Sequence, residues 1–368
     1  MKIAILNNLY KPYQKGGAER IVEILKSDLE ELGYQTFIIS TKPNNKQNPS
    51  ENPGVYYLRS NYRNLWEHSL FFRFFWQVTN LFNLKKYFEI KKILQIEKPD
   101  VIITNNLMGL GMLTFLTAGR AKHLHIIHDI QLLHPSGLMY FGKEKIINSL
   151  YAKCYQLINK TVTNLNKEAV IVSPSAWLLK THQNQGLFLK HPTAVINNPF
   201  RPLDKNIIIN EKSIFLFIGQ LEQHKGVDLF IKAANHFKNY QFVAIGDGPL
   251  KEQVEDTTNL TFVGQKTSTE INDFLSRSLA LIVPSRCYEN SPTVIYEAAA
   301  LGTPVIAASL GGIPELVNRF GGTLFEPDNL DSLVAAISKL LSEKITLKPF
   351  QKEDSYGKRI LSQLKISV

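Results

Sequence analysis

The chain has 368 residues, 44% of them hydrophobic and 20% charged, which is enough for full cores and favours two domains over one. The formal net charge of +10 lies wholly in the first half, where residues 1–200 carry 24 basic and 13 acidic side chains. Such an excess suits a phosphorylated substrate, an anionic membrane surface or nucleic acid. Nucleic acid ranks last and is not expected as a partner, because no nucleic-acid-binding motif is present. Two cysteines, Cys154 and Cys287, provide no disulfide framework and favour a reducing, cytoplasmic compartment.

Short apolar runs alternate with amphipathic runs along the whole chain, a pattern that predicts α/β units with parallel sheets. After the first strand, an amphipathic helix is expected over residues 18–32. The segment 44–53 is rich in Asn, Pro and Ser and is interpreted as a surface loop. The strands expected in the first half cover residues 3–6, 36–40, 101–104, 125–128 and 170–172.

A domain boundary is predicted at residues 194–200, after which a second α/β unit begins. We therefore divide the chain into residues 1–195, 196–347 and 348–368, the last containing a short helix over 356–364. The strands expected in the second unit cover residues 214–218, 242–245, 260–263, 279–283 and 304–307.

Two glutamates eight positions apart, Glu289 and Glu297, flank a strong predicted helix start. Ser291 is a good N-cap residue, and Pro292 suits the first helical position. Both carboxylates would lie at the carboxyl edge of a parallel sheet, where such sheets bind ligands. Carboxylates accept hydrogen bonds from sugar hydroxyls, and a helix start attracts phosphate. A nucleotide-linked sugar would satisfy all of these groups.

Three glycine-containing loops each follow a predicted strand: Gly16-Gly17, the segment 219–226 ending in Lys225-Gly226, and the segment 246–249. Each can present N–H groups, or the Lys225 ammonium, to a phosphate, although each alone also fits a plain turn or a solvated charge. His128-Asp129 follows the strand expected at 125–128, where a histidine alone is more often structural than catalytic. The spacing of the neighbouring histidines fits no metal site.

Five motifs in chain order resemble the retaining glycosyltransferases of family four, whose signature is Glu-x7-Glu. The resemblance covers most of the chain and implies an α/β GT-B fold, with two Rossmann-like domains, a cleft between them and a C-terminal helix that returns to the first domain. The motifs are Gly16-Gly17-Ala18-Glu19-Arg20, His128-Asp129, Lys225-Gly226, Glu289 to Glu297, and Gly311-Gly312-Ile313-Pro314-Glu315.

The resemblance implies transfer of a sugar from a nucleotide-sugar donor to a hydroxyl of a saccharide or lipid-linked acceptor, with retained configuration and without a metal or cofactor. Glu289 would hold the transferred sugar and Glu297 the ribose, while Glu19 and Arg20 are expected at the surface or a hinge. The catalytic residues implied are His128, Lys225 and Glu289. The donor-binding residues implied are Gly16, Gly17, Gln220, Lys225, Gly248, Glu289, Ser291, Thr293, Val294 and Glu297.

The sequence departs from the family pattern at two places. Gln220 stands where the family usually has an arginine, and His224 or Arg286 are candidates for the missing positive charge. Pro292 stands among positions that are usually glycine, and because proline has no N–H, donors must come from neighbouring residues.

Several alternatives stay open. The aromatic stretch 65–76 fits either a core helix or an anionic membrane interface, which would place the protein on the inner membrane face. A GT-B sugar-nucleotide epimerase or phosphorylase would share the fold. A non-catalytic sugar-nucleotide-binding protein would fit the loss of arginine at Gln220.

Overall fold

The computed structural model describes residues 1–13, 16–44, 46, 53–199, 212–255, 257–343, 347–348 and 353–366. The chain forms two compact units. Unit 1 comprises Met1–Leu138, Lys145–Pro199 and Asp354–Val368, and unit 2 comprises Met139–Glu144 and Phe200–Glu353. Most of the loop expected at 44–53 lies outside the described residues.

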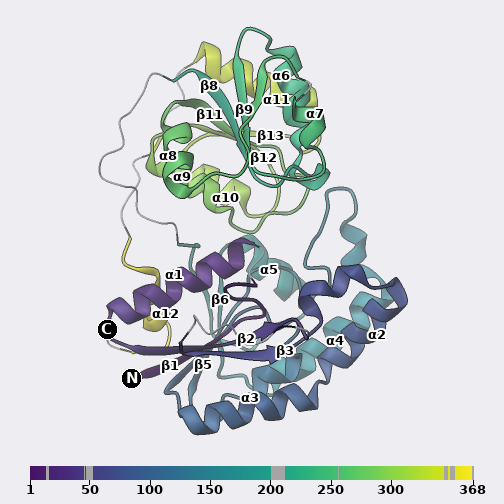
Figure 1. The fold of residues 1–368 in the computed structure, drawn as a ribbon, viewed down its shortest axis with the longest axis vertical. Coiled ribbons are helices and arrows are strands. Elements are labelled where there is room, and N and C mark those ends of the chain that lie inside the picture. The colour runs from purple at the N-terminus through teal and green to yellow at the C-terminus, as the bar shows by residue number, and fades with distance from the viewer. Residues whose placement is uncertain are drawn as a thin grey trace. The chain divides into compact units, whose positions relative to one another are not determined.

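Unit 1 is built on a parallel sheet with the strand order β3-β2-β1-β4-β5-β6-β7 (Figure 1). This order places β1 at the point where the connections change direction, as in doubly wound α/β domains. The strands are β1 (Lys2–Leu6), β2 (Gln35–Lys42), β3 (Val55–Arg59), β4 (Val101–Thr104), β5 (Lys122–Ile126), β6 (Val170–Ser173) and β7 (Thr193–Val195). The α-helices are α1 (Gly17–Glu31), α2 (Leu70–Leu81), α3 (Leu84–Glu97), α4 (Leu150–Asn164), α5 (Ala176–Asn184) and α12 (Tyr356–Ser362). Short 3-10 turns are η1 (Tyr62–Glu67), η2 (Met112–Leu116) and η3 (Glu144–Asn148).

The terminal helix α12 returns to unit 1, where it lies beside α1 (Figure 1). Tyr356, Ile360 and Leu361 are buried in the same apolar cluster as the inner face of α1. The Gly357 N–H donates to Asp28 Oδ2 at 3.0 Å, and a Cβ at Gly357 would lie 2.9 Å from the Asp28 Cβ. The helices therefore approach closely because position 357 has no side chain.

Unit 2 repeats the design with the strand order β10-β9-β8-β11-β12-β13, again all parallel. An aromatic group of Phe215, Phe230 and Phe242 anchors the core on one face of the sheet. The strands are β8 (Ile214–Ile218), β9 (Gln241–Ile245), β10 (Leu260–Phe262), β11 (Ser278–Val283), β12 (Val305–Ala308) and β13 (Thr323–Phe325). The helices are η4 (Gln223–Lys225), α6 (Val227–His236), α7 (Lys251–Glu255), α8 (Ser268–Ser276), α9 (Thr293–Ala300), α10 (Ile313–Phe320) and α11 (Leu330–Ser342).

The strands that the sequence did not predict, β3, β7 and β13, lie at the edges of the sheets. Edge strands can be short and partly exposed, so they lack the apolar runs that mark central strands. The strand expected at 125–128 is instead β5, which ends at Ile126, so His128 lies in the loop that follows.

The aromatic residues of α2 are not packed into the core. Phe71, Phe74 and Phe75 are 73%, 47% and 50% exposed, which contradicts the core-helix interpretation for these side chains. The α2 and α4 helices are neighbours, because Tyr151 donates to Gln77 Oε1 at 2.7 Å and contacts the ring of Phe74. No helix among the described residues is long and apolar enough to cross a membrane.

Buried histidines form a polar cluster next to β4 and β5. Thr104 Oγ1 lies 2.9 Å from both His123 Nε2 and His125 Nδ1, and His182 Nδ1 lies 2.9 Å from the Leu178 carbonyl. Burial lowers the pKa of His123 to about 3 and that of His182 to about 4, and places the pKa of His125 well below its ordinary value. These side chains are therefore neutral in the folded protein at neutral pH.

We expect unit 1 to lose stability as the pH falls below 6.5. The unfolded chain then takes up protons on these histidines while the folded chain does not, so stability is full above the unfolded pKa. At pH 5.5 each such group lowers the free energy of unfolding by about 1.4 kcal/mol. Tryptophan fluorescence in urea measures unit 1 selectively, because Trp66, Trp76 and Trp177 all belong to it. A His182→Leu variant should show a smaller acid loss, and an unchanged loss would contradict this assignment.

Candidate functional site

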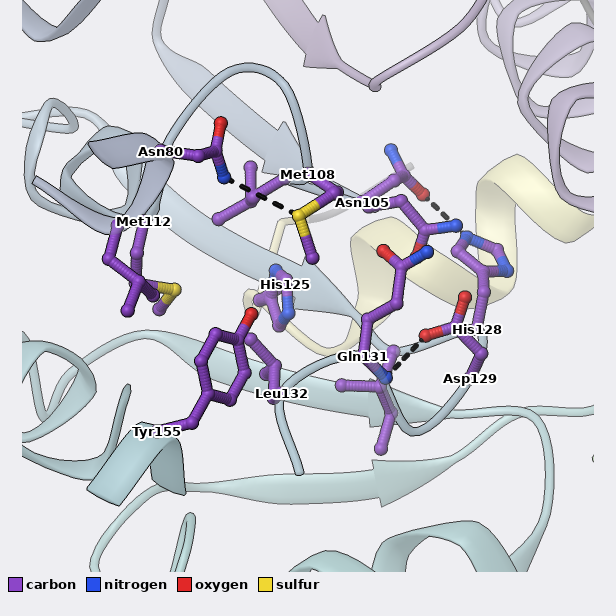
Figure 2. Close-up of a pocket in the computed structure, with 14 residues that line it drawn as sticks. Asn80, Asn105, Met108, Met112, His125, His128, Asp129, Gln131, Leu132 and Tyr155 are labelled. Atoms are coloured by element: carbon purple, nitrogen blue, oxygen red, sulfur yellow. Dashed lines mark hydrogen bonds between the residues drawn. The ribbon is translucent and has the colours of Figure 1, made fainter. Parts of the chain in front are cut away.

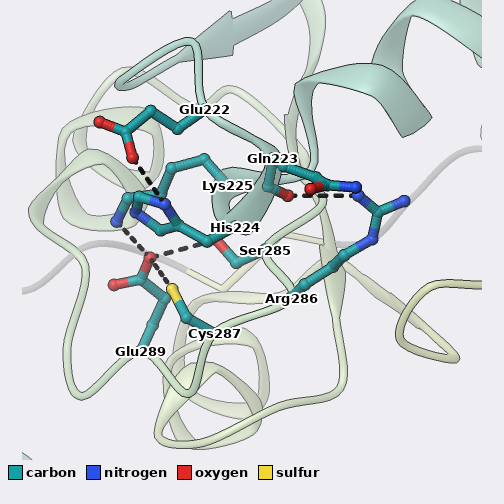
Figure 3. Close-up of polar contacts among 8 residues, drawn as sticks. All are labelled: Glu222, Gln223, His224, Lys225, Ser285, Arg286, Cys287 and Glu289. Atoms are coloured by element: carbon teal, nitrogen blue, oxygen red, sulfur yellow. Dashed lines mark hydrogen bonds and ion pairs between the residues drawn. The ribbon is translucent and has the colours of Figure 1, made fainter. Parts of the chain in front are cut away.

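An ion pair between Lys225 and Glu289 lies at the carboxyl edge of the unit 2 sheet (Figure 3). Lys225 ends η4 after β8, and Glu289 follows β11, the strand next to β8. Their charged atoms, Nζ and Oε1, are 2.6 Å apart. Burial opposes ionisation of Glu289, but Lys225 outweighs it and lowers the Glu289 pKa, and the carboxylate in turn raises the pKa of Lys225 against its burial. Both groups therefore stay charged.

Glu289 is fixed through both its side chain and its backbone. Ser285 Oγ donates to Oε1 at 3.1 Å, and the Gly312 N–H donates to the Glu289 carbonyl at 2.7 Å. Gly311 has a φ of +66°, and a Cβ there would lie 2.2 Å from the Glu289 carbonyl oxygen. The glycine pair before α10 thus allows the close approach that holds Glu289 in place.

Arg286 holds the loop before Glu289, and its guanidinium is already bound to two carboxylates. Its guanidinium binds both carboxylate oxygens of Asp228 at 2.6 and 2.7 Å, and its Nε lies 2.6 Å from Asp328 Oδ1. His224 lies 2.9 Å from Glu222, and burial and then Lys225 lower the His224 pKa, so it is neutral at pH 7. Arg286 therefore does not replace the arginine missing at position 220, and His224 adds no charge there.

A short segment from the first half of the chain pairs with the loop that leads to Glu289. Tyr140 and Cys287 form an antiparallel bridge, and the Tyr288 N–H donates to the Met139 carbonyl at 2.9 Å. Tyr288 also donates its hydroxyl hydrogen to Glu144 Oε1 at 2.9 Å. The other side of the loop is fixed by the Arg286 N–H, which donates to the His224 carbonyl at 2.9 Å.

Helix α9 begins one residue later than predicted, at Thr293 in place of Pro292. Pro292 is the N-cap and Thr293 the first helical residue, so the assignment of Ser291 as N-cap is wrong. Ser291 instead shares a 2.5 Å hydrogen bond with the Tyr296 hydroxyl. Thr293 and the next residue lie in the first turn, where N–H groups have no acceptor within the helix. Glu297 lies farther along α9 and is 6% exposed.

A second group of predicted residues lines an open pocket at the carboxyl ends of β8 and β9. Gly219, Gln220, Gly246 and Gly248 line it together with Asp247 and Gln265. A Cβ at Gly246 would lie 1.8 Å from the Gly219 carbonyl oxygen, so the two loops meet backbone to backbone. Gln220 and Gly248 are thus brought together.

In unit 1, His128 and Asp129 line a pocket at the carboxyl ends of β4 and β5 (Figure 2). His128 Nε2 lies 2.9 Å from Asn105 Oδ1, and burial lowers the His128 pKa to about 4. A neutral imidazole must then carry its hydrogen on Nε2 in order to donate to this amide oxygen. Amide and hydroxyl groups from several elements share the lining: Asn80, Asn105, Asn106, Gln131 and Tyr155.

Asp129 is the group of this pocket whose pKa lies nearest to neutral pH. Burial, with a smaller contribution from Glu19, raises the Asp129 pKa to about 7, although the Gln131 N–H donates to its Oδ1 at 2.7 Å. Sequence reasoning gave no role to Asp129, since an aspartate beside a histidine carries no signal of its burial. The partner amide, Asn105, was missed for the same reason.

The glycine pair forms the start of α1, and Glu19 of the same motif is buried against it. Gly16 is the N-cap of α1, Gly17 begins the helix, and the Gly16 N–H donates to Glu19 Oε2 at 2.9 Å. Glu19 is only 6% exposed, so of its two expected positions, at the surface or at a hinge, the surface position is wrong. Burial follows from its capping role, because the carboxylate turns back over the first turn.

We predict that Gly311→Ala will displace Glu289 and lower catalytic turnover at least tenfold. Gly302→Ala is the matched control, because its φ of +63° imposes the same backbone strain but nothing lies within 4 Å of its Cβ. Both variants should lose about 1–2 kcal/mol of stability from the positive φ. Donor turnover and melting temperature should be measured for each, and equal turnover in the two variants would contradict the positioning role of Gly311.

Comparisons with known proteins place these loops in a family context. Residues 15–202 match the family described as Glycosyltransferase Family 4, and residues 202–358 match Glycosyl transferases group 1. The chain is 30% identical to an uncharacterized 42.6 kDa protein in the cps region of Klebsiella pneumoniae, over 94% of this chain and 95% of that protein. It is 29% identical to a putative teichuronic acid biosynthesis glycosyltransferase, TuaC of Bacillus subtilis, over 42% of this chain and 38% of that protein.

Solved structures share the fold. Sucrose-phosphate synthase from Thermosynechococcus elongatus has a TM-score of 0.66 at 19% identity, covering 93% of this chain and 90% of that one. Anabaena HepE in complex with UDP-glucose has a TM-score of 0.63 at 16% identity, with the same coverage. At these identities the likeness shows the fold alone, which is the two-domain GT-B architecture. Among the described residues, no three His, Cys, Asp or Glu side chains gather as metal ligands would.

Proposed function

Because the chain belongs to glycosyltransferase family 4, we propose that this glycosyltransferase uses a nucleotide diphosphate sugar and retains the configuration of the transferred sugar. We propose further that it needs no metal ion. The observation that carries this proposal is the Lys225–Glu289 pair, 2.6 Å apart and ionised on both sides.

The pair offers the two kinds of group that a sugar diphosphate needs. The Lys225 ammonium can stabilise the negative charge that develops on the departing diphosphate, which is the role that a metal fills in other transferases. The Glu289 carboxylate can accept hydrogen bonds from the sugar hydroxyls. The first turn of α9 adds N–H groups at Thr293 and Val294 for the phosphates.

The remaining donor contacts follow from position in unit 2. Glu297, buried in α9, is assigned to the ribose diol, and the pocket between Gln220 and Gly248 to the nucleotide. Gln220 is uncharged, so Lys225 is the residue of this loop to which we assign the positive charge for the diphosphate. We infer that donor affinity depends more steeply on Lys225 here than it would with an arginine at position 220.

The reaction exchanges one bond for another on the same face of the sugar. The bond from the anomeric carbon to the diphosphate oxygen breaks, and a bond to the acceptor oxygen forms. The proton of the acceptor hydroxyl passes to the leaving diphosphate. His128 is assigned to the contact with the sugar and acceptor as a neutral imidazole rather than as a cation, because its pKa is about 4.

The relatives favour an acceptor of the cell surface. One relative is encoded in a cps region, and another is named for teichuronic acid biosynthesis. HepE was solved with UDP-glucose, which favours UDP-sugars as the first donors to test. We therefore propose a saccharide or lipid-linked acceptor in the synthesis of a surface polysaccharide or glycolipid, on the cytoplasmic side of the membrane.

We expect a nucleotide sugar to bind with an affinity that calorimetry can measure, from a screen of UDP-, GDP- and ADP-sugars. Glu289→Gln should lower donor turnover about 100-fold, the loss typical of a preorganised polar group. The double variant Lys225→Met/Glu289→Gln removes both charges, so it leaves no buried charge without a partner and serves as the stability control.

The following outcomes separate this proposal from its rivals. Proton NMR of the sugar product, recorded before it mutarotates, should show the same anomeric configuration as the sugar in the donor. Turnover should also persist in EDTA, which removes metal ions. Binding without turnover or hydrolysis would identify a non-catalytic sugar-nucleotide-binding protein, and a donor returned with altered sugar stereochemistry would identify an epimerase. Donor binding that is unaffected in the double variant would contradict the role of the ion pair.

We also propose that unit 1 rests on an anionic membrane. The exposed residues Phe71, Phe75 and Val78 repeat at helical spacing along α2, so this apolar stripe faces away from the core. Residues 70–98 contain six basic and two acidic side chains. An exposed aromatic stripe beside excess positive charge is typical of helices that lie in the interface of anionic lipids.

We predict that the protein floats with vesicles of phosphatidylcholine and phosphatidylglycerol and not with phosphatidylcholine alone. Phe71→Ser/Phe75→Ser should abolish flotation, because it removes two apolar anchors. The control is Leu189→Ser, since Leu189 is 64% exposed and lies outside α2, α3 and α4. Equal flotation of both variants, or concentration-dependent dimerisation in place of flotation, would contradict the membrane assignment.

A further inference from the structure

A basic pocket in unit 1 has no role in the function described above. It lies at the carboxyl ends of β2 and β3, beside the first turn of α3. Its cationic lining consists of Lys42, Arg59, Lys85 and Lys86, and Glu89 is its single carboxylate. It shares no lining residue with the pocket that contains His128.

The positive charge of this pocket is largely unbalanced. Glu89 lies 3.0 Å from Lys86 Nζ, so the carboxylate is already paired. Within the described part of the chain, Lys42, Arg59 and Lys85 have no carboxylate partner. Three cations without a counter-ion among the described residues, arranged around one hollow, favour binding of an anion with more than one negative charge.

Lys42 is the residue that structural reasons alone do not explain. It is only 7% exposed, and it lies directly opposite Arg59 in the register of β2 and β3. Like charges at neighbouring positions of adjacent strands repel each other, which destabilises a sheet. Burial, and then Arg59, lower the pKa of Lys42 accordingly. An arrangement that costs stability indicates a ligand that supplies the missing negative charge.

We propose that this pocket binds a phosphate or diphosphate group, with Lys42 and Arg59 as its central contacts. The surroundings suit a phosphate attached to an apolar chain, because Phe82, Leu84 and Phe88 are 52%, 59% and 61% exposed around the start of α3. The pocket and His128 lie at the same edge of the unit 1 sheet. The ligand is therefore the diphosphate of a lipid-linked acceptor, an identity that rests on the proposed transferase function.

The test is calorimetry with three probes: inorganic pyrophosphate, geranyl diphosphate and geraniol. Geranyl diphosphate should bind more tightly than pyrophosphate, and geraniol should not bind. Lys42→Met should weaken diphosphate binding at least tenfold. Lys180→Met is the control, because Lys180 is an exposed lysine on α5 and its loss changes the net charge equally.

The melting temperature gives a second readout with a defined sign. Lys42→Met removes the charge that lies opposite Arg59 and keeps an apolar stem of similar length, so the free variant should melt at or above the wild-type temperature. Ligand binding should then stabilise the wild type more than the variant. A variant that melts far below the wild type would show that Lys42 is structural and would overturn the proposal.

Pyrophosphate can also meet Lys225, so the Lys225→Met/Glu289→Gln variant completes the design. Diphosphate binding that is lost in this variant but kept in Lys42→Met would overturn the proposal. Binding that depends on Lys42 in a protein that binds no nucleotide sugar would keep the phosphate site and reject the transferase donor assignment. Equal affinity for pyrophosphate and geranyl diphosphate would assign a free phosphate in place of a lipid.

Discussion

The ion pair between Lys225 and Glu289 is the interaction on which the candidate site depends. Each residue follows a different strand, and only the pairing of β8 with β11 brings them to 2.6 Å. Each also keeps the other charged against the cost of burial. A ligand that carries negative phosphates and neutral hydroxyls can use both charges at once, whereas an uncharged sugar would leave Lys225 without a role.

The loop before Glu289 is held on both sides, which fixes the position of the glutamate in this ion pair. One side of the loop is fixed by the His224 carbonyl and by Asp228 through Arg286, and the other side pairs with residues 139–141. Those residues follow, in the chain, the loop that carries His128 and Asp129. A segment of the first half thus forms part of the support for the carboxylate in unit 2, and any account of the domains as separate sequence blocks omits it.

Unit 1 differs, because it exposes apolar side chains on α2 and places cations close together in the basic pocket. The stripe on α2 faces away from the core, and Lys42 lies opposite Arg59 with no carboxylate partner in the part of the chain that the structure describes. Such features cost stability in the isolated chain, so a chemistry outside the chain explains them best. Anionic amphiphiles complement both features, because their negative charge matches the cations and their apolar chains match the exposed stripe.

The fold class, the central strands and the loops that carry the candidate residues could all be predicted from the amino-acid sequence. Apolar periodicity and glycine placement are local properties of the sequence, and they suffice to predict central strands such as β4 and β8. Tertiary structure alone decided the rest. Burial of Glu19, the pKa of Asp129, the engagement of Arg286 by two carboxylates and the opposition of Lys42 and Arg59 all depend on contacts between segments distant in the chain. Electrostatic environment is a property of three-dimensional neighbours, and a residue's place in the sequence does not reveal them.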